Sequence, residues 1–218
     1  FHYTGMKREN DAIKRLTGFN SKVSSHYFIK KNGEILTLVP DLYVAWHAGV
    51  SSWKKYKFLN KNSIGIEISN PGHENNYRHF NERQIRSVLR LSRFLINKYK
   101  IKSKFILGHS DISPGRKKDP GEKFPWKDLF KKHIGMWHDL NKKILTKNRN
   151  QAISFIEKNT FYKNLYKIGY SEKSSKKNIN YLKELTTAFQ MRFRQELINS
   201  IVDKECLIIT KNLTKKFL

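Results

Sequence analysis

Two histidines and one aspartate lie in settings that suit metal ligands. His109 follows an apolar segment and opens a loop, where a side chain can project from a sheet end into a cleft. Asp119, ten residues on, is followed by Pro120-Gly121, which fixes the backbone and aims the carboxylate. His2 lies in a strand-like segment at the other end of the chain. Two imidazoles and a carboxylate would leave one tetrahedral position open for water, as in catalytic zinc sites.

The spacing of these three residues does not by itself establish a metal site. The residues are far apart, and no HExxH helix ties them together. The chain contains 8 histidines, so chance alone can supply such a trio. Three ordinary polar side chains therefore remain the alternative at this point.

Glu67 interrupts the apolar, strand-like run from Ser63 to Asn70, where a carboxylate needs a partner. One interpretation is a buried ion pair with one of the many lysines. The other is a general base whose pKa is raised by burial and which faces a metal-bound water. Lys117 could place an ammonium group where an oxyanion develops, or could be a solvated loop lysine. These residue types would suit metal-assisted hydrolysis, but at this point both interpretations stay open, and for Lys117 composition favours the solvated lysine.

Seven short motifs occur here in the order in which they occur in a known family. They read His2-Tyr3-Thr4-Gly5, Val23-Ser24-Ser25-His26-Tyr27, Ala45-Trp46-His47-Ala48-Gly49, Ser63-Ile64-Gly65-Ile66-Glu67, Gly108-His109-Ser110-Asp111-Ile112, Arg116-Lys117-Lys118-Asp119-Pro120-Gly121 and Phe124-Pro125-Trp126. Over residues 1–135 the chain resembles the family 2 N-acetylmuramoyl-L-alanine amidases of the AmpD/AmiD type, which are relatives of peptidoglycan recognition proteins. The ordered set is far more specific than any single motif.

The resemblance implies a reaction and the residues that perform it. One zinc ion per chain would be held by His2, His109 and Asp119. Glu67 would be the base, and Lys117 would stabilise the oxyanion. The expected reaction is hydrolysis of the amide bond between N-acetylmuramic acid, or its 1,6-anhydro form, and L-alanine of the peptidoglycan stem peptide, for cell-wall turnover or recycling. The expected location is the bacterial cell envelope, in the periplasm or associated with the outer membrane.

Three further residues are candidates for substrate binding. Trp46 and His47 are expected to line the floor of the cleft, although a core tryptophan and a hydrogen-bonded histidine fit the sequence equally well. His26 could bind substrate or be a satisfied interior histidine. The other histidines lie in polar segments and are expected at the surface: His73, His79, His133 and His138.

The elements that must position these residues alternate in the first part of the chain. Asn32-Gly33 predicts a tight hairpin, Asn81 with Gln84 a capping box that starts a long helix, and Pro125 the start of a short helix. This pattern predicts an α/β fold, a mixed twisted sheet flanked by helices, like that of peptidoglycan recognition proteins. Strands are expected at residues 1–4, 25–29, 35–39, 64–68 and 105–107.

After about Trp137 the strand patterns end, and three short amphipathic helices are expected. The first closes at Gly169 and the last begins after Asp203. Residues 188–194 resemble the peptidoglycan-binding minidomain appended to AmiD-type enzymes. We therefore predict a catalytic domain over residues 1–147 and a small helical domain over 148–218, which holds the enzyme on polymer and takes no part in the chemistry.

Charge and composition bound the alternatives. The 218 residues include 44 Lys+Arg against 18 Asp+Glu, and the resulting charge of +26 attracts polyanions. A non-catalytic peptidoglycan- or polyanion-binding protein is therefore the main alternative. No specific nucleic-acid partner is expected, because the basic residues lack clustered aromatic residues. No run reaches the roughly 20 apolar residues of a membrane-spanning helix. Because the chain opens in a strand-like segment, we expect a leader or lipid anchor to precede it.

Overall fold

The computed structural model describes residues 1–172 and 179–217. Its strands are β1 (His2–Tyr3), β2 (Tyr27–Ile29), β3 (Ile35–Thr37), β4 (Ser52–Trp53), β5 (Tyr56–Lys57) and β6 (Ile66–Ile68). Its α-helices are α1 (Glu9–Thr17), α2 (Glu82–Tyr99), α3 (His109–Ile112), α4 (Trp126–Lys131), α5 (Lys142–Asn148), α6 (Phe155–Ile168), α7 (Ile179–Phe193) and α8 (Lys204–Phe217). Short 3-10 helices are η1 (Phe19–Ser21), η2 (Leu59–Lys61), η3 (His73–Asn75) and η4 (Ser103–Phe105).

Four strands form one mixed sheet in the order β1-β6-β2-β3. β6 runs parallel to both of its neighbours, β1 and β2, while β3 returns antiparallel to β2. The hairpin predicted at Asn32-Gly33 joins β2 to β3, and Gly33 adopts the positive φ of 88° that the turn requires. β4 and β5 pair in a separate two-stranded hairpin that the sequence did not predict.

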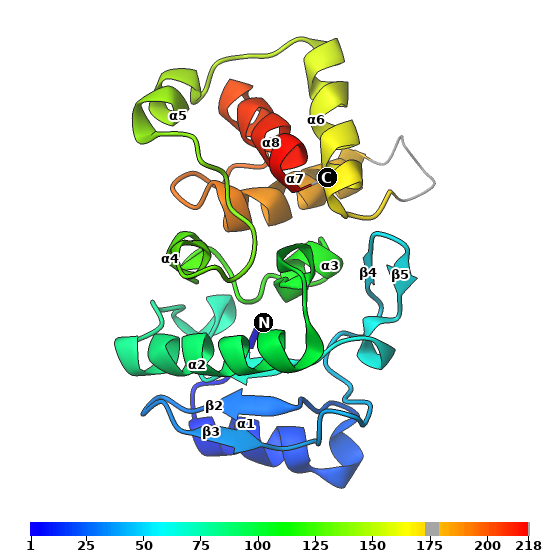
Figure 1. Cartoon of the computed structure of the whole chain (residues 1–218), viewed down its shortest axis with the longest axis vertical. Helices are drawn as coiled ribbons and strands as arrows, with labels where there is room; N and C mark the ends of the chain where they lie inside the picture. Colours follow the sequence, from blue (N-terminus) through cyan, green and yellow to red (C-terminus); the bar gives the residue numbers. More distant parts are fainter. Residues whose placement is uncertain (173–178, 218) are drawn as a thin grey trace.

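Helices cover both faces of the four-stranded sheet (Figure 1). On one face α2 buries Val88 and Leu95 against Ile66 and Ile68 of β6. On the other face α1 lines a cleft together with Glu67. Side chains alternate along a strand, so Glu67 points away from the face that carries its two isoleucine neighbours. The predicted α/β class, a mixed sheet flanked by helices, is confirmed.

The strand predicted at 105–107 is wrong. The segment leaves η4 and bonds to Phe1, the residue before β1. The amino group of Phe1 donates to the Leu107 carbonyl at 2.7 Å, and its carbonyl accepts from His109 N–H at 3.2 Å. Contacts to one residue do not make a strand ladder. The two predicted helix starts are confirmed, and Gln84 N–H donates to Asn81 Oδ1 at 3.0 Å.

Four helices, α5 to α8, form what we call the helical region, residues 142–217 apart from 173–178 (Figure 1, top). Gly169 ends α6, and Asp203 Oδ1 accepts from Cys206 N–H at 2.9 Å at the start of α8, as predicted. Buried side chains of these helices belong to the same apolar core as those of the sheet and α2. Within the described part of the chain, no helix has the length and apolar character that crossing a bilayer requires.

The prediction that His138 lies at the surface is wrong, because its side chain is buried. It is 5% exposed and stacks on Trp137, with ring centroids 5.0 Å apart. Burial lowers the pKa of its imidazole to about 4. The prediction relied on the polar residues near His138 in the sequence. It did not take into account that Trp137, the preceding residue, is buried in the core.

Candidate metal centre and catalytic cleft

The cleft on the α1 side of the sheet has a volume of about 390 Å³. Its walls come from α1, from the strands β1 and β6, and from the loop that follows α3. Glu67, His109, Lys117 and Asp119 all line it. The structure therefore gathers residues from distant parts of the chain around one opening.

His2, His109 and Asp119 form a compact buried cluster at the wall of this cleft. The two Nδ1 atoms lie 2.9 Å apart, and they lie 2.9 and 3.0 Å from Asp119 Oδ2. Burial lowers the pKa of His2 to about 3, so its imidazole is neutral. Burial opposes charge on Asp119, but the two histidines outweigh it and hold the pKa of the carboxyl below its usual value. Two imidazoles and one carboxylate are a donor set that fits Zn²⁺.

His109 Nε2 lies between an acceptor and a donor. It is 3.0 Å from the Ala48 carbonyl oxygen, which can only accept, and 3.1 Å from Arg116 Nη2, which can only donate. Arg116 Nη2 donates to the same oxygen at 2.6 Å and fixes its position. When His109 Nδ1 binds a metal, Nε2 would carry the proton and donate it to the Ala48 oxygen.

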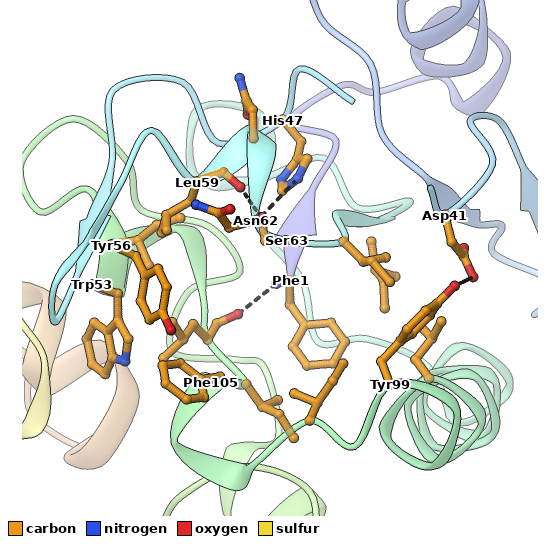
Figure 2. Close-up of a pocket in the computed structure, with 18 of the residues that line it drawn as sticks. Phe1, Asp41, His47, Trp53, Tyr56, Leu59, Asn62, Ser63, Tyr99 and Phe105 are labelled. Atoms are coloured by element: carbon orange, nitrogen blue, oxygen red, sulfur yellow. Dashed lines mark hydrogen bonds between the residues drawn. The ribbon is translucent and has the colours of Figure 1, made fainter. Parts of the chain in front are cut away.

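A chain of hydrogen bonds reaches the other ligand histidine, His2, through His47. Figure 2 shows His47 pointing toward Ser63, whose hydroxyl donates to the Leu59 carbonyl at 2.6 Å. Because Ser63 has used its proton, its Oγ accepts from His47 Nε2, 3.4 Å away. His47 Nδ1 can then accept from His2 Nε2, 3.0 Å away, when His2 Nδ1 binds a metal in place of its contact with Asp119 Oδ2. Gly65 provides room for this ring, since a Cβ there would lie 2.3 Å from His47 Cγ.

Glu67 is placed beside the cluster by strand register. In the β1–β6 ladder it pairs with His2, so the two side chains leave the sheet on the same face. Its Oε2 is buried and has no hydrogen-bond partner among the described residues. Burial, reinforced by the charge of Asp119, raises the pKa of Glu67 well above the ordinary 4.5, while Lys117 acts in the opposite direction. A carboxyl group in this state suits a general base.

A tight turn brings Lys117 to the cleft. The backbone N–H groups of Arg116 and Lys117 both bond to the Ser113 carbonyl, at 3.2 and 3.1 Å. Ser110 N–H donates to the Asp119 carbonyl at 2.8 Å and closes the loop beneath the ligand. The turn thus holds a cationic side chain and a ligand carboxylate on one short, bonded segment.

The three candidates for substrate binding occupy different environments. Trp46 is 56% exposed and lines the cleft, so it is not a core tryptophan. His47 also lines the cleft while it bonds to His2. His26 is buried, with Nε2 donating to the Tyr43 carbonyl at 3.0 Å and Nδ1 accepting from Gly65 N–H at 3.0 Å. Its surroundings match the interior histidine that the sequence allowed.

Ser63 and Arg116 contact the groups around the two histidine ligands, and the sequence predicted no role for either. Each is the first residue of one of the seven motifs, but neither type of side chain is a metal ligand or a usual base. A larger pocket of about 630 Å³ lies behind the histidines on the α2 side, and Figure 2 shows its largely aromatic and aliphatic lining. Glu67 and Asp119 do not line that pocket, so the cleft on the α1 side is the candidate site.

The family of the chain follows from comparison with known proteins. Residues 1–122 match the family model described as N-acetylmuramoyl-L-alanine amidase. The chain belongs to this amidase family. The amidase AmiD of Escherichia coli (strain K12) is 32% identical over 228 residues, an alignment that covers 99% of this chain and 81% of AmiD. The chain is therefore an enzyme of the amidase class, a hydrolase, as predicted.

Two solved structures extend the likeness over 99% of the chain. One is the complex of AmiD from E. coli with anhydro-N-acetylmuramic acid-L-Ala-D-gamma-Glu-L-Lys. It has a TM-score of 0.86 and 32% identity, and it covers 99% of this chain and 87% of that one. The other is AmpDH3 from Pseudomonas aeruginosa in complex with anhydromuramic pentapeptide. It has a TM-score of 0.86 and 29% identity, and it covers 99% and 90% of the two chains.

Proposed function

We propose that this amidase hydrolyses the amide bond between N-acetylmuramic acid, or its 1,6-anhydro form, and L-alanine of the peptidoglycan stem peptide, with one zinc ion. The observation that carries the proposal is the cluster of His2, His109 and Asp119 with Glu67 on the adjacent strand. The substrate class is supported by the two similar structures that hold anhydromuramyl peptides. We further propose that the enzyme works in the bacterial cell envelope, in the periplasm or at the outer membrane, on peptidoglycan or its fragments.

In this mechanism His2, His109 and Asp119 would hold the ion. When bound, zinc would polarise the scissile carbonyl and lower the pKa of a water to about 7. Glu67 Oε2, which has no other partner among the described residues, accepts the proton of the attacking water. It then delivers that proton to the nitrogen of L-alanine as the C–N bond breaks. The Lys117 ammonium stabilises the negative charge on the former carbonyl oxygen.

The test is digestion of purified peptidoglycan with product identification by mass spectrometry. We expect free stem peptides that begin with L-alanine, and glycan that has lost them. Elemental analysis should find one zinc per chain, and His109→Ala should lose both the metal and the activity. Full activity in a metal-stripped sample would contradict the zinc mechanism. Co-sedimentation with peptidoglycan without product release would favour the non-catalytic binding protein.

A further inference from the structure

Asp111 is a buried carboxylate in α3, the short helix that begins with the ligand His109. Its exposed fraction is 0%. Oδ2 accepts from Gly108 N–H at 2.7 Å and from Arg192 Nη1 at 2.5 Å, and Oδ1 accepts from the Tyr170 hydroxyl at 2.7 Å. A buried charge with this many partners is stable only while the partners stay in place.

Two of these partners come from the helical region. Tyr170 follows α6, and Arg192 lies in the last turn of α7. Arg192 is itself 1% exposed, and its Nη2 donates to the Ile106 carbonyl at 2.9 Å. Its guanidinium stacks 3.8 Å from the ring centroid of Trp126. Arg192 therefore bonds to residues on both sides of His109, to Ile106 before it and to Asp111 after it.

Other contacts join the helical region to the β4–β5 hairpin and to the loop that carries Lys117 and Asp119. The Trp53 ring lies edge-on to Tyr170, with centroids 5.0 Å apart. A Cβ on Gly169 would lie 2.4 Å from the Trp53 ring, so the two segments approach as closely as a glycine allows. Glu184 of α7 lies against the loop that follows α3. A Cβ on Gly115 of this loop would be 2.1 Å from Glu184 Oε2. These contacts are closer than those of a satellite domain with a modest interface.

We infer that the helical region supports the metal centre, because Arg192 and Tyr170 hold Asp111 and thereby fix the position of His109. This inference rests on the proposed zinc function. It differs from the prediction that the helices take no part in the chemistry. Arg192 and Tyr170 are positioning residues, since they act on His109 only through Asp111 and the backbone around it.

The experiment compares two arginine variants in the full chain. Arg192→Met removes the cation and keeps most of the side-chain length. The matched control is Arg194→Met, because Arg194 is also buried and pairs with the buried Asp203 at 2.5 Å, entirely within the helical region. Both variants leave a buried carboxylate without its cation, so both should lower the melting temperature. Only Arg192→Met should disturb the metal centre.

The readouts are zinc affinity, from competition with a chelator well below either melting temperature, and the visible absorption spectrum of the cobalt-substituted protein. Arg192→Met should bind zinc about 10- to 100-fold more weakly, the range seen when groups that orient ligands are lost, and should shift the cobalt bands. Arg194→Met should keep the wild-type affinity and spectrum.

Tyr170→Phe removes one hydrogen bond to Asp111 and keeps the ring, so it serves if Arg192→Met does not fold. It should weaken zinc binding in the same direction by a smaller factor. If Arg192→Met folds and keeps the wild-type zinc affinity and cobalt spectrum, the inference is overturned. If Arg192→Met does not fold, the same result in Tyr170→Phe would overturn it. Equal weakening by Arg194→Met would overturn it too, because the effect would then be one of general stability. A wild-type chain that binds neither zinc nor cobalt would overturn the proposed function itself.

Discussion

The cleft and the junction between the sheet and the helical region each bury a carboxylate, but with opposite surroundings. At the junction, both oxygens of Asp111 accept hydrogen bonds, and a guanidinium balances the charge. In the cleft, Glu67 Oε2 has no partner among the described residues, and burial raises the pKa of its carboxyl. The carboxylate of Asp111 therefore has hydrogen-bond partners and a counterion, whereas burial without a partner disfavours the charged form of Glu67.

This contrast separates two uses of a buried acid. A carboxylate whose oxygens are both engaged ties segments of the chain together and cannot accept a further proton without losing those bonds. A carboxylate without partners adds nothing to the fold, but its free oxygen can take a proton from a reacting group. Burial alone therefore does not identify the catalytic base, and Glu67 is distinguished by an unpartnered oxygen on the strand beside the ligand cluster.

The largest effect is expected from Glu67→Gln, which tests whether the unpartnered carboxylate is the base. The amide keeps the volume but cannot accept the proton of water, so the turnover rate should fall by about 10²- to 10⁴-fold. Zinc content should not change, because Glu67 is not among the three clustered ligands. Glu74→Gln is the matched control, since Glu74 also lines the cleft but has an 84% exposed side chain. Wild-type turnover in Glu67→Gln would show that the unpartnered carboxylate is not the general base.

Lys117→Ala should have the next largest effect. Loss of the ammonium that stabilises the oxyanion should reduce turnover by about 10²- to 10³-fold without loss of zinc. The neighbouring Lys118→Ala is the control, because Lys118 is 60% exposed and pairs with Glu74 at 3.6 Å on the rim. Steady-state kinetics on a soluble muropeptide would distinguish the two. If both variants lost the same small factor, Lys117 would contribute only general positive charge.

His47→Ala should act on the metal rather than on the chemical step. Without His47 Nδ1 as acceptor, His2 Nε2–H loses the partner that fixes its tautomer, and zinc affinity should fall by about 10- to 100-fold. His138→Ala is the control, because His138 is also buried but stacks on Trp137, outside the ligand cluster. Chelator competition measures both. Unchanged zinc affinity in His47→Ala would show that the lost bond does not orient His2.

Local signals in the sequence were sufficient for much of the fold. The capping box at Asn81, the hairpin at Asn32-Gly33 and the end of α6 at Gly169 each depend on residues within a few positions, and all three are present. The strand expected at 105–107 failed because its apolar character reflects packing and not pairing. The prediction for His138 was wrong because its neighbour Trp137 is buried and stacks on it.

The site depended on contacts that no local pattern encodes. His2 and Asp119 are 117 residues apart, and the resemblance to a family, not their spacing, pointed to them. The register that pairs His2 with Glu67 involves strands of two and three residues, too short to be aligned by periodicity. Arg192 lies 81 residues from Asp111, and although it belongs to the segment 188–194 noted in the sequence, no local pattern pairs it with Asp111.

The smallest expected effect is on stability, and it has opposite signs for the two acids. Burial raises the pKa of Glu67 in the folded, metal-free protein above its ordinary 4.5 in the unfolded chain. Below that pH the carboxyl is protonated in both states and has no effect on stability. As the pH rises, the unfolded chain ionises more readily, so the folded protein loses stability. Glu67→Gln should therefore remove a loss of folding stability, whereas Asp111→Asn should cause one, because it breaks the buried pair with Arg192.

Melting curves of the metal-free variants near neutral pH and at about pH 4 would measure both signs. Glu67→Gln should raise the melting temperature near neutral pH by a few degrees, since about 1 kcal/mol moves the midpoint by about 2–4 °C in a chain of this size. The gain should disappear in acid, where wild-type Glu67 is neutral as well. Asp111→Asn should lower the melting temperature by more, because breaking a buried pair costs about 3–5 kcal/mol and leaves the guanidinium of Arg192 without its counterion. A lower melting temperature for Glu67→Gln near neutral pH would mean that the carboxylate has a stabilising partner, and the contrast between the two acids would then be one of degree only.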